Sequence, residues 1–461
     1  MFDSNGMSRR SFLKQTGAGL VAASAFPTII PSRAFGAADR INIAVVGLHG
    51  RGTSHLRAFP ALPNVTLHSI VDVDGNVGAM RQQEMTTALK YTPKLFDDFR
   101  RVLDDKDVHA VSFAVPNHWH ALASIWAAQA GKHVYVEKPA SHSIWEGQQM
   151  INASRKYNTL MQVGFQNRSS TSVQAAIKLM RDGGIGKVFM CRGLCHKQRG
   201  NIGHYPDGPM KAGEKLALTV DSPSNAPAYT ADYMSKVNYD MWIGPREVRP
   251  FNRNRFHYNW HWQWPTGNGD TGNQGPHQLD VGRWGLGKDE DPIRIRSTGG
   301  YFAYDNSDQT TPNTQTSVFE YADGTIFEFT TRGLNTNPEG GIMIGDIWYG
   351  SEGRLEIDDG GRWKTFMGKR STAGPTSEGI RGGSHFETFI NAVRSGKRDD
   401  LTCDIAEGVR SSNLAHMANI SYRLGRELRT DGKKTAFLND AEANAMMKDS
   451  YRAPYVVPDL G

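Results

Sequence analysis

The stretch Ile41-Asn42-Ile43-Ala44-Val45-Val46-Gly47-Leu48-His49-Gly50-Arg51-Gly52 decides the fold of this chain. Its first six residues are mostly aliphatic, as in a strand that a parallel sheet buries on both faces. The glycines that follow allow a tight turn and let the backbone approach a pyrophosphate at a helix N-terminus. His49 stands where a G-x-G-x-x-G turn has its middle glycine, so Gly50 is expected to supply the close approach. The stretch predicts the first strand and turn of a dinucleotide-binding domain.

A second predicted strand, residues 65–71, ends at Asp72. A carboxylate about twenty residues beyond the turn accepts hydrogen bonds from a ribose 2′-hydroxyl and repels a 2′-phosphate. The sequence therefore favours NAD over NADP. The alternatives are that Asp74 takes this role, or that Asp72 only caps the following helix.

Two clusters of polar residues follow later predicted strands. Residues 108–115 lead into Pro116-Asn117-His118-Trp119-His120, and residues 133–136 lead into Glu137-Lys138-Pro139. Ligands of doubly wound sheets bind at the carboxyl ends of the strands, so both clusters are expected to face the cofactor. For His118 alone, a hydrogen bond at the start of a helix is the preferred interpretation.

These motifs together resemble the Gfo/Idh/MocA family of nicotinamide-dependent oxidoreductases. The resemblance continues through Gly131-Lys132-His133-Val134, residues 164–168, 242–245 and 267–287, and Phe386 to Val393. It implies a Rossmann domain followed by an α/β domain with an open, mostly antiparallel sheet, and a sugar or polyol as substrate. The predicted cofactor contacts are Gly47, His49, Gly50, Arg51, Gly52, Asp72, Pro116, Asn117, His120, Glu137, Lys138 and Gln166.

The later sequence agrees with such a sheet. Residues 187–197 and 293–305 alternate in polarity, and residues 316–321 and 325–330 flank the hairpin signal Ala322-Asp323-Gly324. Residues 342–349 and 354–357 form another pair, and residues 384–395 and 405–424 read as helices. We divide the chain into a Rossmann domain (39–165), a substrate-binding domain (166–425) and a C-terminal tail (426–461). A free face of the open sheet suits a homodimer or homotetramer.

The predicted chemical centre is Gly272-Asn273-Gln274-Gly275-Pro276-His277. The resemblance implies an Asp-x-x-x-His pattern with the histidine as general base, a task suited to an unperturbed pKa of about 6.5. His277 matches, but Asn273 replaces the aspartate. Lys138 is expected to hydrogen-bond or protonate the same oxygen; the alternatives are a helix cap for His277 and a surface ion pair with Glu137 for Lys138.

A long segment of low regularity, residues 200–275, precedes this centre. It is too aromatic for disorder, and its rings from His257 to Trp264 suit stacking on sugars, although packing against the sheet explains any single tryptophan equally well. The predicted substrate contacts are Arg168, His196, Tyr205, Trp260, His261, Asn273 and Asp280.

Composition excludes several other classes of protein. The net charge of +6 on 461 residues comes without a Lys/Arg run, so we predict no nucleic-acid partner. Three cysteines cannot form a disulfide framework, and Cys191 and Cys195 are expected about 13 Å apart along one strand. Neither this pair with His196 nor His257 with His261, where no helix is evident, has convincing metal-site spacing, and we predict no metal.

The N-terminus carries an export pattern. Ser8-Arg9-Arg10-Ser11-Phe12-Leu13-Lys14 precedes a small-residue apolar run, residues 16–30, which resembles a twin-arginine signal. The run is too short and too rich in small residues for stable membrane insertion. We expect residues 1–38 to be a signal peptide read by the Tat translocon, and the enzyme to be periplasmic.

The functional hypothesis is an exported NAD-dependent oxidoreductase acting on a ring hydroxyl of a sugar or glycoside. Because there is no nicotinamide pool outside the cytoplasm, the cofactor is expected to stay bound and be recycled. The alternative is a redox-neutral glycoside hydrolase or lyase working through a transient 3-keto intermediate. The sequence does not name the sugar, the carbon oxidised or the anomer.

Overall fold

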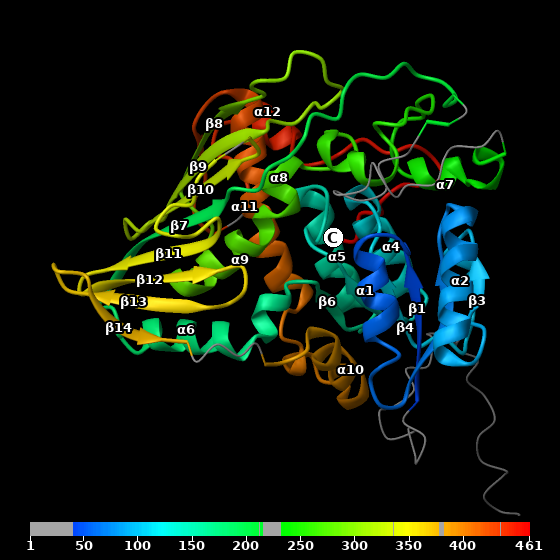
Figure 1. The fold of residues 1–461 in the computed structure, drawn as a ribbon, viewed down its shortest axis with the longest axis horizontal. Coiled ribbons are helices and arrows are strands. Elements are labelled where there is room, and N and C mark those ends of the chain that lie inside the picture. Colours follow the sequence, from blue (N-terminus) through cyan, green and yellow to red (C-terminus); the bar gives the residue numbers. More distant parts are fainter. Residues whose placement is uncertain (1–39, 212, 215–231, 335, 378–381, 434) are drawn as a thin grey trace, which may run out of the picture.

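The computed structural model describes residues 40–461 except 212, 215–231, 335, 378–381 and 434 (Figure 1). The predicted signal peptide lies outside the described residues. In the described ranges, no helix combines the length and the apolar character that crossing a membrane requires.

The first domain is a parallel sheet in the order β3-β2-β1-β4-β5-β6, with helices on both faces. Its strands are β1 (Ile41–Val46), β2 (Val65–Val71), β3 (Lys94–Phe96), β4 (Ala110–Phe113), β5 (His133–Val136) and β6 (Met161–Val163). Its helices are α1 (Arg51–Ala58), α2 (Gly75–Leu89), α3 (Arg100–Leu103), α4 (Asn117–Gln129) and α5 (Ile144–Lys156). The strand order reverses between β1 and β4, which makes that point the expected ligand crevice. The predicted Rossmann fold is confirmed.

The second domain contains a nine-stranded sheet in the order β14-β13-β12-β11-β7-β10-β9-β8-β15. Its strands are β7 (Val188–Cys195), β8 (Arg294–Gly300), β9 (Thr314–Glu320), β10 (Ile326–Arg332), β11 (Ile344–Gly350), β12 (Gly353–Asp358), β13 (Trp363–Met367), β14 (Thr372–Thr376) and β15 (Leu428–Arg429). Only the β7–β10 pair is parallel, so the mostly antiparallel sheet is confirmed.

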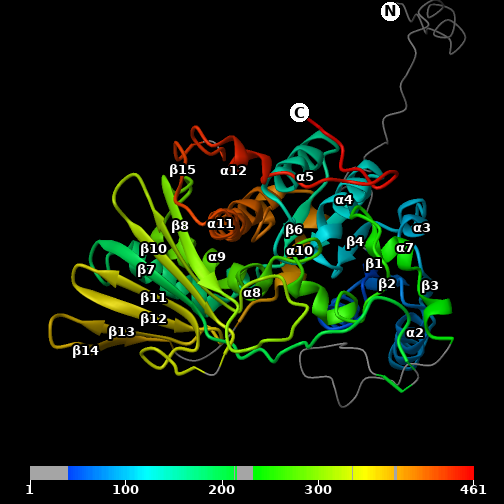
Figure 2. The same ribbon diagram turned by 90° about the horizontal axis from the view of Figure 1, so that it is seen from above.

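Helices cover one face of this sheet. In Figure 2, α9 and α11 lie between the sheet and the Rossmann domain, and their side chains share one core with the inner face of the sheet. The longer helices are α6 (Thr171–Arg181), α9 (Gly275–Leu286), α10 (His385–Ser395) and α11 (Ile405–Leu424). Cys191 and Cys195 belong to this core, and all three cysteines are buried and free.

The described part of the segment from residue 200 to 275 is more regular than its sequence suggests. It contains η3 (Met234–Lys236), α7 (Tyr239–Ile243), η4 (His257–Trp262) and α8 (Gly269–Asn273). The absence of a helix around His257 and His261 was therefore a wrong expectation: a 3-10 helix carries both. Further short elements are η2 (Gln166–Ser169), η5 (Arg398–Asp400) and α12 (Ala441–Ala445).

The described C-terminal residues, 426–433 and 435–461, are integrated into the fold and do not form a free tail. β15 pairs with β8, and Tyr455 and Val457 are buried in the core on one face of the Rossmann sheet. The core on its other face contains Phe389 and Ile390 of α10. Apolar side chains that the sequence assigns to the second domain and tail thus complete the first domain.

Candidate active site

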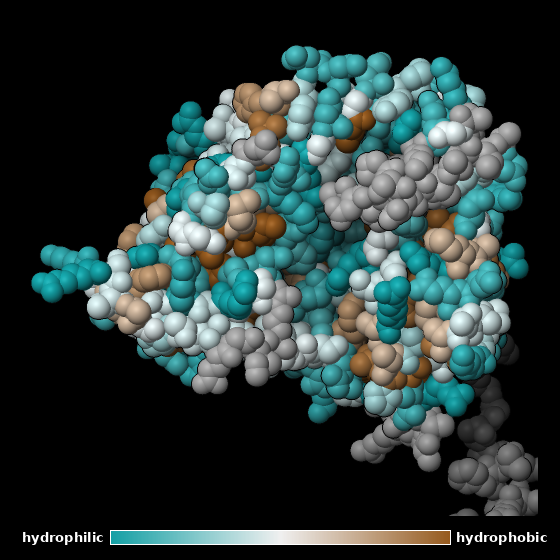
Figure 3. Space-filling model, viewed as in Figure 1, coloured by the Kyte–Doolittle hydropathy of each residue, from teal (hydrophilic) through white to brown (hydrophobic). Residues whose placement is uncertain are grey.

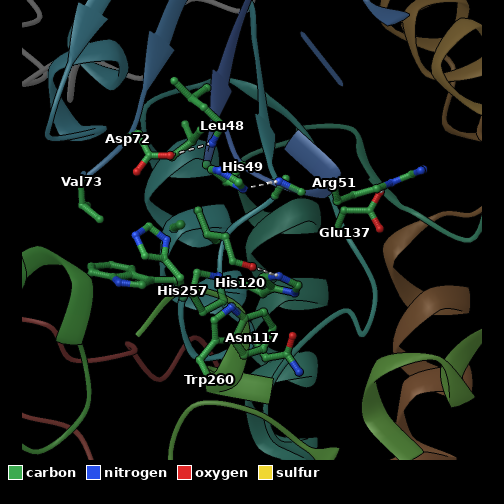
Figure 4. A pocket seen from close by; sticks show the side chains of 18 of the residues that line it. Leu48, His49, Arg51, Asp72, Val73, Asn117, His120, Glu137, His257 and Trp260 are labelled. Atoms are coloured by element: carbon green, nitrogen blue, oxygen red, sulfur yellow. Dashed lines mark hydrogen bonds and ion pairs between the residues drawn. The ribbon is translucent and has the colours of Figure 1, made fainter. Parts of the chain in front are cut away.

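A cavity of about 360 Å³ lies where the two domains meet. Figure 3 shows a hollow between the two lobes, and Figure 4 shows side chains from both domains around it. The residues after β1, β2, β4 and β5 line it together with residues of α7, η4, α8 and α9. The cavity therefore occupies the predicted crevice at the carboxyl ends of the parallel strands.

The glycine turn forms one wall of the cavity. A Cβ added to Gly52 would lie 1.8 Å from the carbonyl oxygen of Gly47, so only glycine fits this close contact. Gly50 has a φ of +50°, and a Cβ there would meet nothing within 4 Å. The backbone is thus open at Gly50, where the sequence predicts the approach of a pyrophosphate to the N-terminus of α1.

Asp72 lies at the end of β2 beside this turn (Figure 4). Its carboxylate accepts hydrogen bonds from the backbone N–H of Leu48, at 2.8 Å, and of Asp74, at 2.9 Å. Burial nevertheless raises the pKa of Asp72 from 3.8 to about 6. Asp74 is the N-cap of α2, so the capping role belongs to Asp74, whereas Asp72 lines the cavity.

The pKa of Asp72 leads to a testable pH dependence. Asp72 is ionised at neutral pH, and it gains a proton and loses an acceptor as the pH falls through about 6. We expect the affinity for NAD to fall below pH 6 by at most about tenfold per pH unit. Titration of NAD into cofactor-depleted protein between pH 5 and 8 measures this. Asp72→Asn should bind more weakly at neutral pH and lose the dependence; an unchanged dependence in this variant would assign it to another group.

Glu137 is held by three side chains from two elements, α1 and η2. Arg51 Nε lies 2.9 Å from its carboxylate, His55 Nε2 lies 3.0 Å away, and Gln166 Nε2 donates to it at 2.9 Å. Burial by itself raises the pKa of Glu137, but Arg51 and His55 outweigh it and hold the pKa well below its usual range. A surface ion pair with Lys138 does not form. The network instead fixes the end of β5, from which Lys138 projects.

Lys138 is half-buried in the cavity wall. Its Nζ donates a hydrogen bond to the backbone carbonyl of Asn273 at 2.6 Å and lies 3.5 Å from the Asn273 side-chain oxygen. Burial lowers the pKa of Lys138 to about 8, although the nearby carboxylate of Glu137 opposes this. The ammonium is therefore mostly charged at neutral pH and loses its proton within a physiological range.

His277 lies in the first turn of α9 and also lines the cavity. Burial and the positive charge of Lys138 lower the pKa of His277 to about 3, so its ring is neutral at pH 7. Among the described residues, none hydrogen-bonds its ring nitrogens. Because Gln274 occupies the N-cap position of α9, the helix-cap alternative for His277 does not apply.

The aromatic segment supplies the wall next to these two groups. The rings of Trp260 and His261 stack at 3.6 Å, and His261 Nδ1 donates to the Tyr258 carbonyl at 2.6 Å. Burial lowers the pKa of His261 well below its ordinary value, so its Nε2 is an unprotonated acceptor. Trp260, His261 and Asn273 line the cavity as predicted, and Tyr258 joins them although the sequence analysis did not single it out.

Four predicted substrate contacts are not among the residues that line the cavity: Arg168, His196, Tyr205 and Asp280. Arg168 and Asp280 bind each other at 2.7–2.9 Å, and both are buried. His196 is buried at the end of β7, and Tyr205 stacks against Arg253. The structure thus gives these four residues packing or ion-pair partners instead of access to a ligand there.

Most polar side chains of the cluster after β4 form hydrogen bonds with other groups of the protein. His118 Nε2 bonds the carbonyl of Trp242 at 3.0 Å, so its hydrogen bond joins α4 to a distant segment and not, as the preferred interpretation expects, to the start of its own helix. His120 lines the cavity, but its ring nitrogens lie 2.6 and 2.9 Å from the carbonyls of Pro139 and Val115. Asn117 Nδ2 donates to the side chain of Asn268 at 2.8 Å. Pro116 and Asn117 also line the cavity.

Residues of the second domain are tied to the end of β2 near Asp72. We call residues 233–238 the strap. Val237 forms an isolated antiparallel bridge with Asp74, Asn238 N donates to the Val73 carbonyl at 2.7 Å, and the Tyr233 hydroxyl donates to the Asp74 carboxylate. From η4, His257 Nε2 approaches the same carboxylate at 2.9 Å. This end of the cavity is therefore bridged by both domains.

One group of possible metal ligands occurs among the described residues: His68, Asp105 and Asp107. They lie toward the amino ends of the strands, away from the cavity, and Lys94 already pairs with Asp105 at 2.9 Å. In the described part of the chain, the residues that line the cavity contain no such group.

The site suits a dinucleotide. The open backbone at Gly50 and the carboxylate of Asp72 lie in one cavity, where the sequence predicts the pyrophosphate and the ribose, and Lys138 and His277 line the same cavity. Residues 41–165 match the family model "oxidoreductase family, NAD-binding Rossmann fold", and residues 228–346 and 375–457 match that of its C-terminal alpha/beta domain.

Known proteins of similar sequence include sugar enzymes. The chain is 40% identical over 158 residues to levoglucosan dehydrogenase of Pseudarthrobacter phenanthrenivorans, covering 34% of this chain and 40% of that protein. It is 28% identical over 211 residues to a glycosyl hydrolase family 109 protein of Saccharopolyspora erythraea, covering 41% and 46%. The matched stretches span less than half of either relative.

A solved structure extends the likeness to both domains. Levoglucosan dehydrogenase in complex with NADH and levoglucosan has a TM-score of 0.59 to this structure at 18% identity, covering 85% of this chain and all of that one. This likeness shows the shared fold. The matched family models show that the chain belongs to the Gfo/Idh/MocA family of oxidoreductases and that its cofactor is NAD.

Proposed function

We propose that the protein oxidises a ring hydroxyl of a sugar or glycoside, and that it keeps its NAD bound through the reaction cycle. The observation that carries this proposal is the meeting of Lys138 and His277 in the NAD cavity, beside the stacked rings of Trp260 and His261. Aromatic faces suit the C–H faces of a sugar ring. Both curated relatives named above also carry names of enzymes of sugar or glycoside chemistry.

The two residues divide the proton chemistry. Bound NAD supplies the hydride acceptor. His277 is neutral and has a ring nitrogen available, so it takes the hydroxyl proton as general base. Lys138 is charged below about pH 8 and donates a hydrogen bond to the same oxygen, which stabilises the negative charge that develops there.

Export gives a reason for cofactor retention. The twin-arginine pattern at residues 8–14 suits delivery of a folded, loaded enzyme to the periplasm, where no nicotinamide pool replaces a lost cofactor. The strap and His257 support retention, because their contacts with Val73 and Asp74 must break before this end of the cavity opens. The hydride then returns to a second sugar or to the same substrate.

The name of the glycosyl hydrolase relative favours a second candidate, a redox-neutral glycosidase or lyase. In this scheme, oxidation at C3 acidifies the proton at C2, the aglycone leaves by elimination, water adds, and the hydride returns to C3. The same site performs the first step in both candidates. A Tyr-Pro-Thr-His motif, which we associate with one group of such hydrolases, does not occur in the sequence, so this candidate ranks second.

Product analysis separates the two candidates. The purified mature protein is incubated, without added cofactor, with levoglucosan, myo-inositol, free aldoses and a panel of aryl α- and β-glycosides. Keto-sugar formed together with a reduced second sugar supports the oxidoreductase, whereas free sugar with released aglycone and no net reduction supports the hydrolase. If no substrate changes in either way, the proposed function is wrong.

The proposed retention predicts what denaturation releases. Purified mature protein should yield close to one NAD(H) per chain and little NADP(H), measured by chromatography of the denatured supernatant. Removal of one Asp74 contact with His257→Ala should raise the cofactor dissociation rate by roughly 10–100-fold, because a hydrogen bond to a charged group contributes about 1.5–3 kcal/mol. Full activity of cofactor-free protein, or mainly NADP(H), would contradict the proposal.

Assembly is also proposed. The outer face of the nine-stranded sheet exposes Phe189, Val318 and Ile326, and Figure 3 shows hydrophobic patches over this sheet. We propose that a second copy covers this face in a homodimer or homotetramer. Light scattering of the purified protein measures the mass, and a monomer at micromolar concentration rejects the assembly.

A further inference from the structure

A buried ion pair contacts Asn273 and Tyr258, two of the residues that line the cavity. Arg199 follows β7, and its Nη2 and Nε lie 2.7 and 2.9 Å from the two carboxylate oxygens of Asp270 in α8. Only 7% of the Arg199 side chain and 4% of the Asp270 side chain are exposed. Because the cost of removing two charges from water often equals their mutual attraction, such a pair is weak evidence of a stabilising role. Its position next to the cavity suggests another role.

The pair is connected to Lys138 through a single residue. Asp270 and Asn273 are three residues apart on α8 and share one face, and Asn273 Nδ2 lies 3.4 Å from the Asp270 carboxylate. With its amide nitrogen turned toward Asp270, Asn273 presents its side-chain oxygen to Lys138 Nζ at 3.5 Å, and its backbone carbonyl accepts from Nζ at 2.6 Å. Two oxygens of Asn273 thus set the direction of the Lys138 amine.

Arg199 also contacts η4, the aromatic segment that forms part of the cavity wall. Arg199 Nη1 donates to the Tyr258 hydroxyl at 3.3 Å, and its guanidinium lies 5.1 Å from the ring centroid of Trp262. Arg199 is itself fixed, because its N–H donates to the Gly333 carbonyl and its carbonyl accepts from the Tyr304 hydroxyl. The pair therefore joins a rigid part of the sheet to both α8 and η4.

We propose that the Arg199–Asp270 pair is a positioning device that orients Asn273 and thereby aims Lys138 at the reacting oxygen. The inference rests on the proposed function of Lys138. It also explains the departure from the Asp-x-x-x-His pattern. A carboxylate at residue 273 would place a full negative charge next to Lys138. In this chain Asp270 orients the uncharged Asn273, and Arg199 neutralises the charge of Asp270.

The effect of the Arg199–Asp270 pair on Lys138 can be tested without a substrate, because both charges act on the pKa of Lys138. Asp270 raises the pKa of Lys138 and Arg199 lowers it. The other ionisable groups around Lys138 are Glu137, Arg51, His120, His261 and His277. If the pair acts on Lys138, the two single variants must change the pKa of Lys138 in opposite directions.

The experiment measures the pKa of Lys138 in the purified holoenzyme by competitive acylation with acetic anhydride across pH 6–11, followed by peptide mass spectrometry. Asp270→Asn should lower this pKa, and Arg199→Met should raise it. With a substrate identified by the product analysis, the basic limb of the kcat profile should move the same way, with kcat lower by roughly 10–100-fold and KM little changed.

A double variant and a control complete the design. Arg199→Met/Asp270→Leu removes both charges, so it should fold and retain NAD while still losing turnover. Lys288→Met removes a buried cation paired with Asp323 far from the cavity, and should leave the pKa of Lys138 unchanged. Single variants that shift the pKa in the same direction or not at all overturn the inference. If the two single variants shift the pKa of Lys138 in the expected opposite directions but the wild-type protein turns over no sugar, the proposed function is rejected and the inference about the pair is not.

Discussion

His277→Ala is expected to lower kcat by roughly 10²–10⁴-fold, the usual contribution of general acid–base catalysis. The burial of His277 keeps its ring neutral, and no described residue occupies its ring nitrogens, so the variant removes an available proton acceptor. His277 lies on α9, away from the glycine turn and Asp72, so NAD content should stay at the wild-type level. Turnover and released NAD are measured on the same preparation.

The matched control is Asn273→Asp. This variant places a carboxylate next to Lys138, and it is expected to raise the pKa of Lys138 and to change the pH profile while His277 is intact. Near wild-type turnover in His277→Ala would remove His277 from the mechanism. His261, whose Nε2 is an unprotonated acceptor in the same cavity, would then be the first histidine to test.

The local elements of the fold could be predicted from the sequence because each is encoded in a short stretch. The aliphatic run of β1, the strand ending at Asp72 and the hairpin at Asp323 need no information from elsewhere. Position at the carboxyl ends of parallel strands then brings Gly50, Asp72 and Lys138 to one crevice. His277 came from the family resemblance, and the structure places it in the same cavity.

Pairings between distant segments could not be predicted in the same way. Arg168 and Asp280 are 112 residues apart and Arg199 and Asp270 are 71 apart, so no local pattern links them. An isolated charged residue near a motif suggests a ligand contact. In the fold, Arg168 and Asp280 satisfy each other, because two buried charges are tolerated only when paired.

The strap and the C-terminal residues show a second limit of prediction from the sequence. Tyr233 and His257 contact Asp74 only because the chain crosses back from the second domain to the first. The sequence assigns Tyr455 and Val457 to a C-terminal tail, but a surface on the Rossmann domain buries them. Where a later segment packs back onto the first domain depends on which apolar surface the rest of the fold leaves uncovered.

Lys138→Met is the second variant with a large expected effect, a loss of about 10²–10³-fold in kcat, as for removal of one donor to a developing oxyanion. Met has a similar volume and no charge, and Glu137 keeps its bonds to Arg51, His55 and Gln166, so the variant should fold. A thermal melt and the NAD content check that the loss is chemical.

The pH profile decides which role Lys138 has. Burial lowers the pKa of Lys138 to about 8, so the ammonium is present below pH 8 and lost above it. If Lys138 donates to the oxygen while His277 takes the proton, kcat stays level up to about pH 8 and then falls. Lys138→Arg, which cannot lose its charge in this range, should keep part of the turnover and abolish the fall. A wild-type rate that instead rises through pH 8 would make the neutral amine of Lys138 the base and reduce His277 to a binding role.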